Sequence, residues 1–201
     1  MKRTRDGERT RKRILDAAAE EFSRHGFEAA TLSGIARRAK VSKQLIYHHF
    51  RSKESLFTQT HEVKFWPKAK WDETLPRNPV EMFAERFRKR AADLDYVRFL
   101  TWEAAGRRNR PVPGEKERRE RVAEYGTRLR SMQVSGSLPA DLDHRLIQLA
   151  ILSLANYPVA FAQITRMVTG RSATDPGFCR AWTRFLRKIG RRLFGRKTRR
   201  Q

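Results

Sequence analysis

The chain has 201 residues, 33% of them charged and 39% apolar, so it is long enough for one or two domains with a real core. Its formal charge of +23, from 45 Lys and Arg against 22 Asp and Glu, predicts a polyanionic partner, although a highly soluble surface is the alternative. The single cysteine, Cys179, excludes an internal disulfide and suits a reducing cytoplasm. The charged first residues predict no secretory signal.

Two helices are predicted first, over residues 8–25 and 32–39, after a basic arm at residues 1–8. The apolar stripe of the first helix consists of Ile14, Leu15, Ala18 and Phe22. Gly26 then suits a left-handed C-cap. In the second helix one face carries Leu32, Ile35, Ala36 and Ala39, spaced i, i+3, i+4, i+7. Thr31 precedes that helix as an N-cap, because its hydroxyl can accept from free backbone N–H groups.

A third short helix is predicted over residues 43–49, after the capping residue Ser42. Its buried pair is Ile46 and Phe50, four residues apart. The opposite face carries polar, aromatic and basic side chains, namely Lys43, Gln44, Tyr47 and His48. A short helix with an apolar back and such a front suits a DNA major groove. Ser52 caps the next helix, whose free amide groups can hold a phosphate.

This region resembles the DNA-binding domain of TetR-type transcriptional regulators. The motifs that carry the resemblance are Ile35-Ala36, Val41-Ser42, Ile46 to Phe50, Ser52-Lys53-Glu54 and Leu56-Phe57. The resemblance is close over the first 57 residues and holds in outline beyond them. One departure is Lys40, where the family usually has glycine in the turn. A positive φ there costs a residue with a side chain about 1 kcal/mol. Gly34, inside the second helix, marks a close approach between helices.

The resemblance and the residue types together predict the DNA contacts. Lysine pairs well with guanine O6 and N7 and glutamine with adenine N6 and N7, so Lys43 and Gln44 are the expected base readers. Tyr47 and His48 are expected on phosphates or base methyl groups. Four more residues are expected to anchor phosphates, by their positions in the family's motif: Thr31, Ser42, His49 and Lys53. An ordinary solvated helix end is the alternative for Lys43 and Gln44.

The rest of the chain predicts six further helices and an all-α, nine-helix TetR-like fold. These helices cover residues 52–75 (bent or split at Pro67), 79–93, 96–108, 115–132, 141–168 (kinked or split at Pro158) and 176–194. We therefore expect three parts. They are a three-helix helix-turn-helix domain at residues 1–52, a helical effector-binding and dimerisation domain at 53–195, and a basic tail at 196–201. For the arm a minor-groove or phosphate contact and a solvated end are both left open, whereas a solvated end is preferred to a binding role for the tail.

Residues 146–165 carry no charge and are long enough to cross a bilayer. However, Gln148, Asn156 and Pro158 lie inside this stretch, and a core helix is also apolar nearly all round. The buried-helix interpretation is therefore preferred to a membrane span.

The last predicted helix is amphipathic, with Phe178, Trp182, Phe185, Ile189 and Leu193 forming its stripe. Packing inside the monomer would explain this stripe. The resemblance implies more, because the last two helices of such regulators usually form a four-helix bundle across a two-fold axis. The expected dimer interface is Phe178, Trp182, Phe185 and Ile189.

Members of the resembled family also bind a small effector among helices four to eight. The aromatic side chains there predict a largely apolar ligand, with an acid group if arginines such as Arg98 lie close. The guessed ligand contacts are Trp66, Phe87, Phe99, Trp102 and Asn156, although plain core packing is the alternative for each. No metal-ligand spacing, phosphate loop or nucleophile elbow is found, so we expect no cofactor and no enzymatic activity.

The function predicted from the sequence is a cytoplasmic, dimeric, sequence-specific DNA-binding regulator. It is expected to be a repressor that a small apolar ligand releases from a palindromic operator. One alternative is a general basic nucleic-acid-binding or architectural protein without an effector. Another alternative is a membrane-associated protein that uses residues 146–165 or the basic tail.

Overall fold

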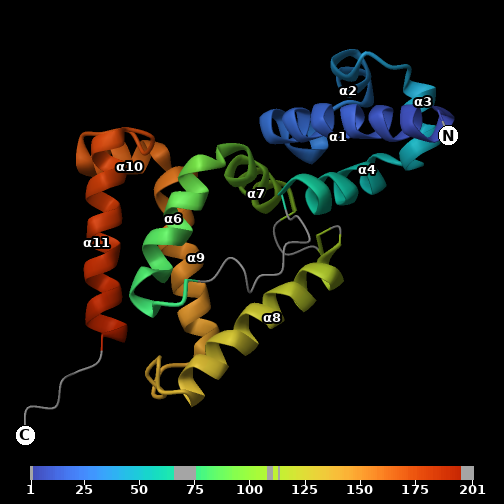
Figure 1. Cartoon of the computed structure of the whole chain (residues 1–201). Coiled ribbons are helices and arrows are strands. Elements are labelled where there is room, and N and C mark those ends of the chain that lie inside the picture. Colours follow the sequence, from blue (N-terminus) through green and yellow to red (C-terminus); the bar gives the residue numbers. More distant parts are fainter. Residues whose placement is uncertain (1, 66–75, 108–110, 113, 196–201) are drawn as a thin grey trace, which may run out of the picture. The chain divides into compact units, whose positions relative to one another are not determined.

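The computed structural model describes residues 2–65, 76–107, 111–112 and 114–195, and these residues form ten α-helices and no strand (Figure 1). The helices are α1 (Lys2–Ala29), α2 (Leu32–Ala39), α3 (Lys43–Phe50), α4 (Lys53–Thr60), α6 (Met82–Ala92), α7 (Leu94–Arg107), α8 (Glu115–Val134), α9 (His144–Ala160), α10 (Ala162–Thr169) and α11 (Pro176–Phe194). A π-helical turn, η1 (His61–Phe65), follows α4, and a 3-10 turn, η2 (Pro79–Glu81), precedes α6. The prediction of an all-α fold is confirmed.

Several predicted boundaries differ from those observed. The first helix begins at Lys2, so helical backbone includes most of the arm. Gly26 has φ 73° and ψ 178°, which is a kink with positive φ and not the left-handed cap that we predicted, and the helix resumes as far as Ala29. The predicted helix over 52–75 is α-helical only to Thr60 and then widens into η1. Its remaining part, with Pro67, lies outside the described residues.

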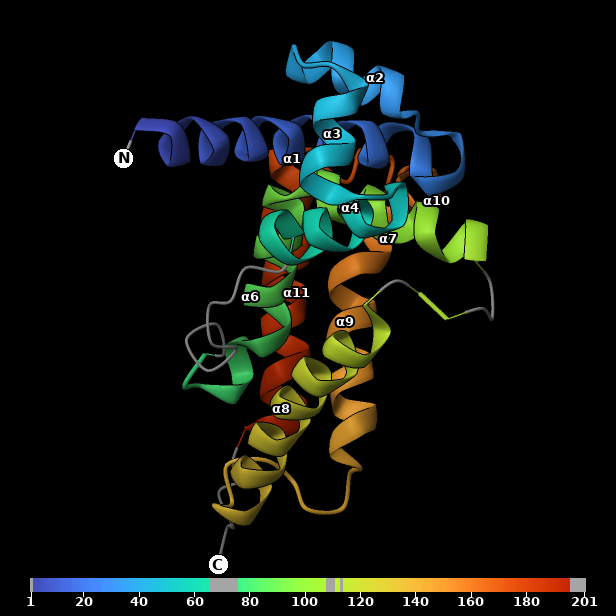
Figure 2. The ribbon, with the colours of Figure 1, turned by 90° about the vertical axis from the view of Figure 1, so that its right-hand side faces the viewer.

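The chain divides into two compact units, each with its own core. The N-terminal unit comprises Met1–Ala69 and Arg98–Glu115, and the C-terminal unit comprises Lys70–Val97 and Lys116–Gln201. In the N-terminal unit α2 and α4 pack against α1, while α3 packs against α2 and α4 (Figure 2). The largest buried side chains of its core are Ile14, Leu15, Phe22, Ile35, Ile46, Phe50, Leu56, Phe57 and Phe99. The stripes predicted for the first three helices therefore form this core.

The turn between α2 and α3 contains the strained residue that the departure from the family predicted. Lys40 has φ 53° and ψ 51°, the left-handed conformation that glycine adopts without cost. The Arg13 guanidinium secures the turn, since its Nη2 donates to the carbonyl oxygens of Ala39 (2.6 Å) and Lys40 (3.0 Å). At Gly34 an added Cβ would collide with the Glu21 carboxylate, which confirms the close approach of α1 and α2.

In the C-terminal unit α6 packs against both α9 and α11, and the three helices lie side by side (Figures 1 and 2). Together with α8 these helices form the core of the unit. This core includes Phe83, Phe87, Tyr125, Leu129, Ile147, Ile151, Phe178, Leu186 and Phe194. The Arg187 guanidinium on α11 donates to both carboxylate oxygens of Glu81, each at 2.9 Å. Both contacts come from the one Nε–H, and this bifurcated, charge-assisted interaction joins the 3-10 turn to α11.

Pro158 produces the predicted split, and a tryptophan compensates for it. The helix breaks at Phe161, and α9 and α10 meet at an angle of 83°. Proline has no N–H to donate to the carbonyl of residue 154, one turn earlier. Instead the Trp182 indole Nε1 donates to the Leu154 carbonyl oxygen (3.3 Å). The Thr165 hydroxyl donates to the Pro158 carbonyl oxygen (2.9 Å), so the bend is held on both sides.

No single helix of the described residues has the length and apolarity to cross a bilayer. Only α9 and α10 taken together pass such a test of length and composition, and the two are sharply bent.

Candidate nucleic-acid interface

The α3 helix presents a polar front and buries an apolar back, as its sequence predicts. Ile46 and Phe50 are each about 1% exposed and belong to the core of the N-terminal unit. Lys43, Gln44 and His48 are exposed, and Tyr47 is 52% exposed although its ring is largely apolar. The front of α3 is thus a surface of hydrogen-bonding groups ready for base edges.

The two expected phosphate anchors with hydroxyl groups also cap the helices. Thr31 Oγ1 accepts from the Gly34 amide (3.0 Å) at the start of α2, and Ser42 Oγ accepts from the Leu45 amide (3.1 Å) at the start of α3. Both residues are exposed. A capping hydroxyl that accepts a backbone N–H keeps its own proton for donation. Each can therefore cap its helix and donate to a phosphate oxygen at the same time, beside the positive end of the helix dipole.

His49 occupies a different environment from its exposed neighbour His48. The His49 ring is half-buried beside Phe50, with 6.1 Å between ring centroids. Burial, followed by the charges of His48 and Arg11, lowers the pKa of His49 below its ordinary value of 6.5. The ring is therefore neutral at pH 7 in the free protein and offers one N–H donor.

Lys53 begins α4 and is held by the end of α1. Its Nζ donates to the Glu28 carbonyl oxygen (3.2 Å) and lies 4.7 Å from the centroid of the Phe27 ring. These contacts fix the ammonium group beside the amide end of α4, where Ser52 Oγ accepts from the Ser55 amide. The sequence predicted Lys53 as a phosphate anchor but gave no sign of its contacts with α1.

Two arginines of the basic region after the arm have structural partners. Arg11 Nη2 donates to Gln59 Oε1 (2.6 Å), and its Cζ lies 5.5 Å from the centroid of the Phe50 ring. Arg13 secures the Ala39–Lys40 turn, as described above. Arg9 and Lys12 are exposed. The sequence alone could not distinguish Arg11 and Arg13 from Arg9 and Lys12. All four are basic residues on one short stretch of helix, and only the packing of α1 shows which of them have partners.

Two similarities to known proteins identify the family of this chain. A family model described as bacterial regulatory proteins of the tetR family matches residues 14–60. The HTH-type transcriptional repressor SCO4008 of Streptomyces coelicolor is 31% identical over 169 residues, which cover 83% of this chain and 86% of that protein. The chain belongs to the TetR family. It is accordingly a DNA-binding transcriptional regulator and not an enzyme.

Solved structures of regulators have the same fold. SCO4942 of Streptomyces coelicolor, described as a transcriptional regulator, is 26% identical and superposes with a TM-score of 0.75 over 94% of this chain and 99% of that one. FadR from Bacillus subtilis, in complex with stearoyl-CoA, is 19% identical with a TM-score of 0.64, over 92% of this chain and 99% of that one. The second likeness concerns the fold alone.

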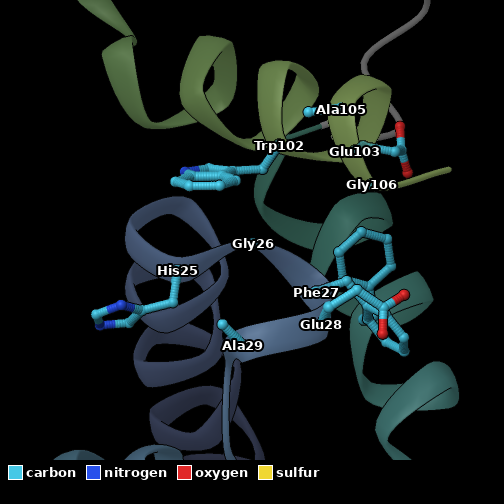
Figure 3. Close-up of a pocket in the computed structure, with 10 residues that line it drawn as sticks. His25, Gly26, Phe27, Glu28, Ala29, Trp102, Glu103, Ala105 and Gly106 are labelled. Atoms are coloured by element: carbon cyan, nitrogen blue, oxygen red, sulfur yellow. The ribbon is translucent and has the colours of Figure 1, made fainter. Parts of the chain in front are cut away.

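The guessed effector contacts of this TetR-family chain fall in different places. Phe87 is fully buried in the core of the C-terminal unit, and Phe99 in that of the N-terminal unit. Trp102 is 47% exposed and lines a cavity inside the N-terminal unit (Figure 3). Asn156, on α9, has a buried Oδ1 without a hydrogen-bond partner. Trp66 lies outside the described residues.

The guessed dimer residues lie along one stripe of α11, on which the rings of Phe178, Trp182 and Phe185 stack in succession. Phe178 is buried in the core and Trp182 is half-buried, whereas Phe185 is 48% exposed. Ile189 is half-buried. Phe178 and Trp182 also line an apolar cavity of about 350 Å³ between α9, α10 and α11. The stripe is thus covered by the core at Phe178 and partly exposed from Trp182 onward.

Proposed function

We propose that this chain is a repressor that binds a palindromic operator as a homodimer, with α3 of each copy in a major groove. The observation that carries the proposal is the exposure of Lys43, Gln44, Tyr47 and His48 over a buried Ile46. Lys43 and Gln44 stand at the start of α3, where side chains of a recognition helix reach base edges. Thr31, Ser42, His49 and Lys53 would hold phosphates around them and set the register.

A two-fold dimer through α9 and α11 is supported by the apolar surface of these helices. Leu146 (65%), Leu149 (59%) and Tyr157 (51%) on α9 are exposed, as is Phe185 (48%) on α11. A set of large apolar side chains along two adjacent helices marks an interaction surface. Two copies joined there would carry two α3 helices to successive major grooves, one helical turn of DNA or about 34–36 Å apart.

Release by a small, largely apolar effector is supported by the unpaired Asn156 Oδ1 and by the related folds. A buried amide oxygen without a donor loses about 1–3 kcal/mol relative to a satisfied one, so a ligand that donates to it gains from the contact. FadR, which shares the fold, holds stearoyl-CoA. The ligand must bind the DNA-incompetent form better, since otherwise it shifts no equilibrium. A tenfold loss of operator affinity requires about 1.4 kcal/mol of such coupling. We place this activity in the cytoplasm.

Selection of bound DNA from a random pool tests the function and supplies the operator. A palindromic consensus, bound at least about a thousandfold more tightly than random DNA at one stated salt concentration, is expected for a specific regulator. On that operator, Gln44→Ala should cost about 1–3 kcal/mol and relax the preference at one base position in each half-site.

Lys53→Ala serves as the comparison, because a phosphate contact carries no sequence information. This change should weaken all sequences similarly and lower the slope of log K against log salt by about one. Equal losses on operator and random DNA for both variants would remove the division between base readers and anchors. A wild-type protein without preference for any sequence would instead favour a general basic nucleic-acid binder.

A further inference from the structure

The α11 helix carries a row of positive charges that the function proposed above does not use. Its 19 residues include six Lys or Arg and no Asp or Glu. Four of these cations are spaced i, i+4, i+8 and i+11, so they follow one side of the helix. This cationic row consists of Arg180, Arg184, Lys188 and Arg191, and all four residues are exposed.

Packing within the C-terminal unit turns the cationic row toward solvent. α11 packs against α6 and η2 (Figure 1), and its residues Leu186 and Gly190 are buried. On a helix with 3.6 residues per turn, Arg180 and Arg184 lie about 40° apart, whereas Leu186 lies about 120° or more from both. Phe185, on the proposed dimer surface, lies about 100° or more from both. The row is therefore distinct from the core and from that surface.

The charges of the cationic row are not compensated inside the protein. Within the described residues none of its four members has an ion pair or a side-chain hydrogen bond, whereas Arg187 on the same helix pairs with Glu81. Like charges at i and i+4 repel each other. The helix dipole favours cations in the last turn, so it compensates Arg191 but not Arg180. The free chain thus carries an electrostatic cost along this row that a bound polyanion would remove.

The α8 helix is just as highly charged but has both signs of charge. Its first ten residues, EKERRERVAE, contain four Glu and four Lys or Arg. Such a mixture is sufficient for a soluble surface. The cations of α11 have no carboxylates between them, so solubility alone does not explain its composition. Since α8 from Lys116 onward belongs to the same unit, its exposed cations provide a matched control.

The length and chemistry of the cationic row fit a nucleic-acid backbone. From Arg180 to Arg191 the helix rises roughly 17 Å, at about 1.5 Å per residue. Each DNA strand carries one phosphate for about every 3.4 Å of helix axis, so the row can lie along several phosphates. Three of its four members are arginines, whose planar guanidinium matches a phosphate with two parallel N–H bonds.

An anionic membrane fits the same row less well. A helix that lies in a bilayer interface inserts its apolar face among the lipids. On α11 the residues Leu186 and Phe194 belong to the core of the C-terminal unit, so this face is already used inside the protein.

We propose that the cationic row of α11 binds the phosphate backbone of double-stranded DNA, as a second contact in addition to that of α3. Phosphate contacts carry no sequence information, so this contact strengthens the binding of any duplex. It requires neither the palindromic operator, nor the dimer, nor the effector proposed above. The phosphates belong either to the duplex that α3 contacts or to a second duplex, and the experiment distinguishes the two.

Two triple variants of the full chain, compared on a duplex of random sequence, test the proposal. The row variant combines Arg180→Gln, Arg184→Gln and Lys188→Gln. The control variant removes three exposed cations of α8 by Lys116→Gln, Arg119→Gln and Arg130→Gln. Both variants lose the same net charge, so long-range attraction to DNA falls equally in the two. Glutamine is a good helix former, and both variants should unfold and sediment like the wild type.

The salt dependence of binding, measured by fluorescence anisotropy, separates local contacts from net charge. The row variant should lower the slope of log K against log salt by about two to three, and it should bind at least about tenfold more weakly at about 50 mM salt. The control variant should change the slope by less than about one. Equal changes in the two variants would overturn the proposal, as would a row variant that binds like the wild type.

Two further measurements identify the source of the phosphates. Protein loaded on a bead-bound duplex is tested for capture of a second, fluorescent duplex. If the row binds a second duplex, only the row variant should lose this capture; if it binds the same duplex as α3, the row variant and the control should capture equally. Flotation with vesicles of equal parts phosphatidylserine and phosphatidylcholine should be the same for both variants. A row variant that loses vesicle binding but keeps DNA binding would assign the row to a membrane and contradict the proposal.

Discussion

The two units of this chain carry their surfaces for interaction in different ways. In the N-terminal unit the candidate DNA contacts lie within residues 31–53, on α3 and at the starts of α2, α3 and α4. In the C-terminal unit the apolar surface comes from α9 and α11, which are separated by α10 in the sequence and both pack against α6. A site made from one contiguous motif can be read from the sequence. A surface assembled from two separate helices depends on which face each helix turns outward.

The largest effect should come from breaking the assembled surface of the C-terminal unit. Phe185→Glu places a charge on an apolar side chain that is already 48% exposed, so the single chain should keep its fold. In a dimer the same charge would be buried without a partner. We expect a monomer by sedimentation at micromolar concentration. We also expect a loss of operator affinity of about a hundredfold or more, because the second half-site no longer binds intramolecularly.

Val134→Glu is the matched control for this charge. Val134 ends α8, is 85% exposed and belongs to the same unit. It should leave both the sedimentation and the DNA affinity unchanged. A wild-type chain that sediments as a monomer, or a Phe185→Glu variant that remains dimeric, would contradict the proposed interface. Trp182→Glu is a poorer test, because Trp182 also donates to the Leu154 carbonyl oxygen beside Pro158.

Much of the N-terminal unit could be predicted, because the spacing of its apolar residues and the positions of its capping residues indicate the same helices. The helical spacing of Ile35, Ala36 and Ala39 identifies one buried face, and Thr31 and Ser42 fix where two helices begin. The kink at Gly26 could not be predicted in this form. A glycine after an apolar stripe suits either a C-cap or a kink, and only the indole of Trp102, more than seventy residues later in the chain, occupies the space beside it.

In the C-terminal unit the helices could be predicted better than their faces. Asp175 and Pro176 began α11 as expected, with Asp175 Oδ1 accepting from the Phe178 amide (2.8 Å). The aromatic stripe of α11, however, lies at the edge of its buried face. Leu186 is fully buried, whereas Phe185, its neighbour, is 48% exposed. An amphipathic pattern identifies a broad apolar sector, and the packing of α6 against α11 selects which part of it is buried.

Two glycine-to-alanine changes compare how tightly the units are packed. A Cβ on Gly190 of α11 would collide with the Val80 carbonyl oxygen, which belongs to the backbone and cannot rotate away. A Cβ on Gly34 would meet the carboxylate of Glu21, which is a side chain and can move. Gly190→Ala should therefore lower the free energy of unfolding by roughly 1–3 kcal/mol. Gly34→Ala should cost less, since the Glu21 side chain can move aside, while alanine in a helix returns up to about 1 kcal/mol at both positions. Urea denaturation of both variants measures this difference, and equal losses would contradict it.

Lys40→Gly should stabilise the N-terminal unit, whereas the two glycine-to-alanine changes should destabilise their units. Lys40 has φ 53°, and glycine adopts this conformation without the steric cost that a Cβ imposes. We expect a gain of about 1 kcal/mol in the free energy of unfolding. Arg13 should continue to donate to the carbonyl of residue 40, since that contact is to the backbone. Lys12→Gly, in the interior of α1, is the control and should destabilise by about 1 kcal/mol instead. No gain for Lys40→Gly would mean that the left-handed turn is not strained.

The smallest effect concerns His49 and distinguishes the fold of the N-terminal unit from its contact with DNA. Burial, with the charges of His48 and Arg11, lowers the pKa of His49 in the free protein. The unfolded chain therefore takes up this proton first as the pH falls. Stability contributed by the neutral ring is complete above about pH 6.5 and decreases from there toward the lowered pKa.

A DNA phosphate beside the His49 ring favours the protonated form and raises its pKa, so operator affinity should increase as the pH falls over the same range. We expect a gain of about twofold to fivefold between pH 7.5 and pH 6. His49→Gln should remove that part of the pH dependence from both unfolding and DNA binding. The two opposite slopes can arise together only if His49 is buried in the free protein and close to a phosphate in the complex. An operator affinity whose pH dependence is the same in wild type and His49→Gln would therefore exclude His49 as a phosphate anchor, even if its effect on stability remained.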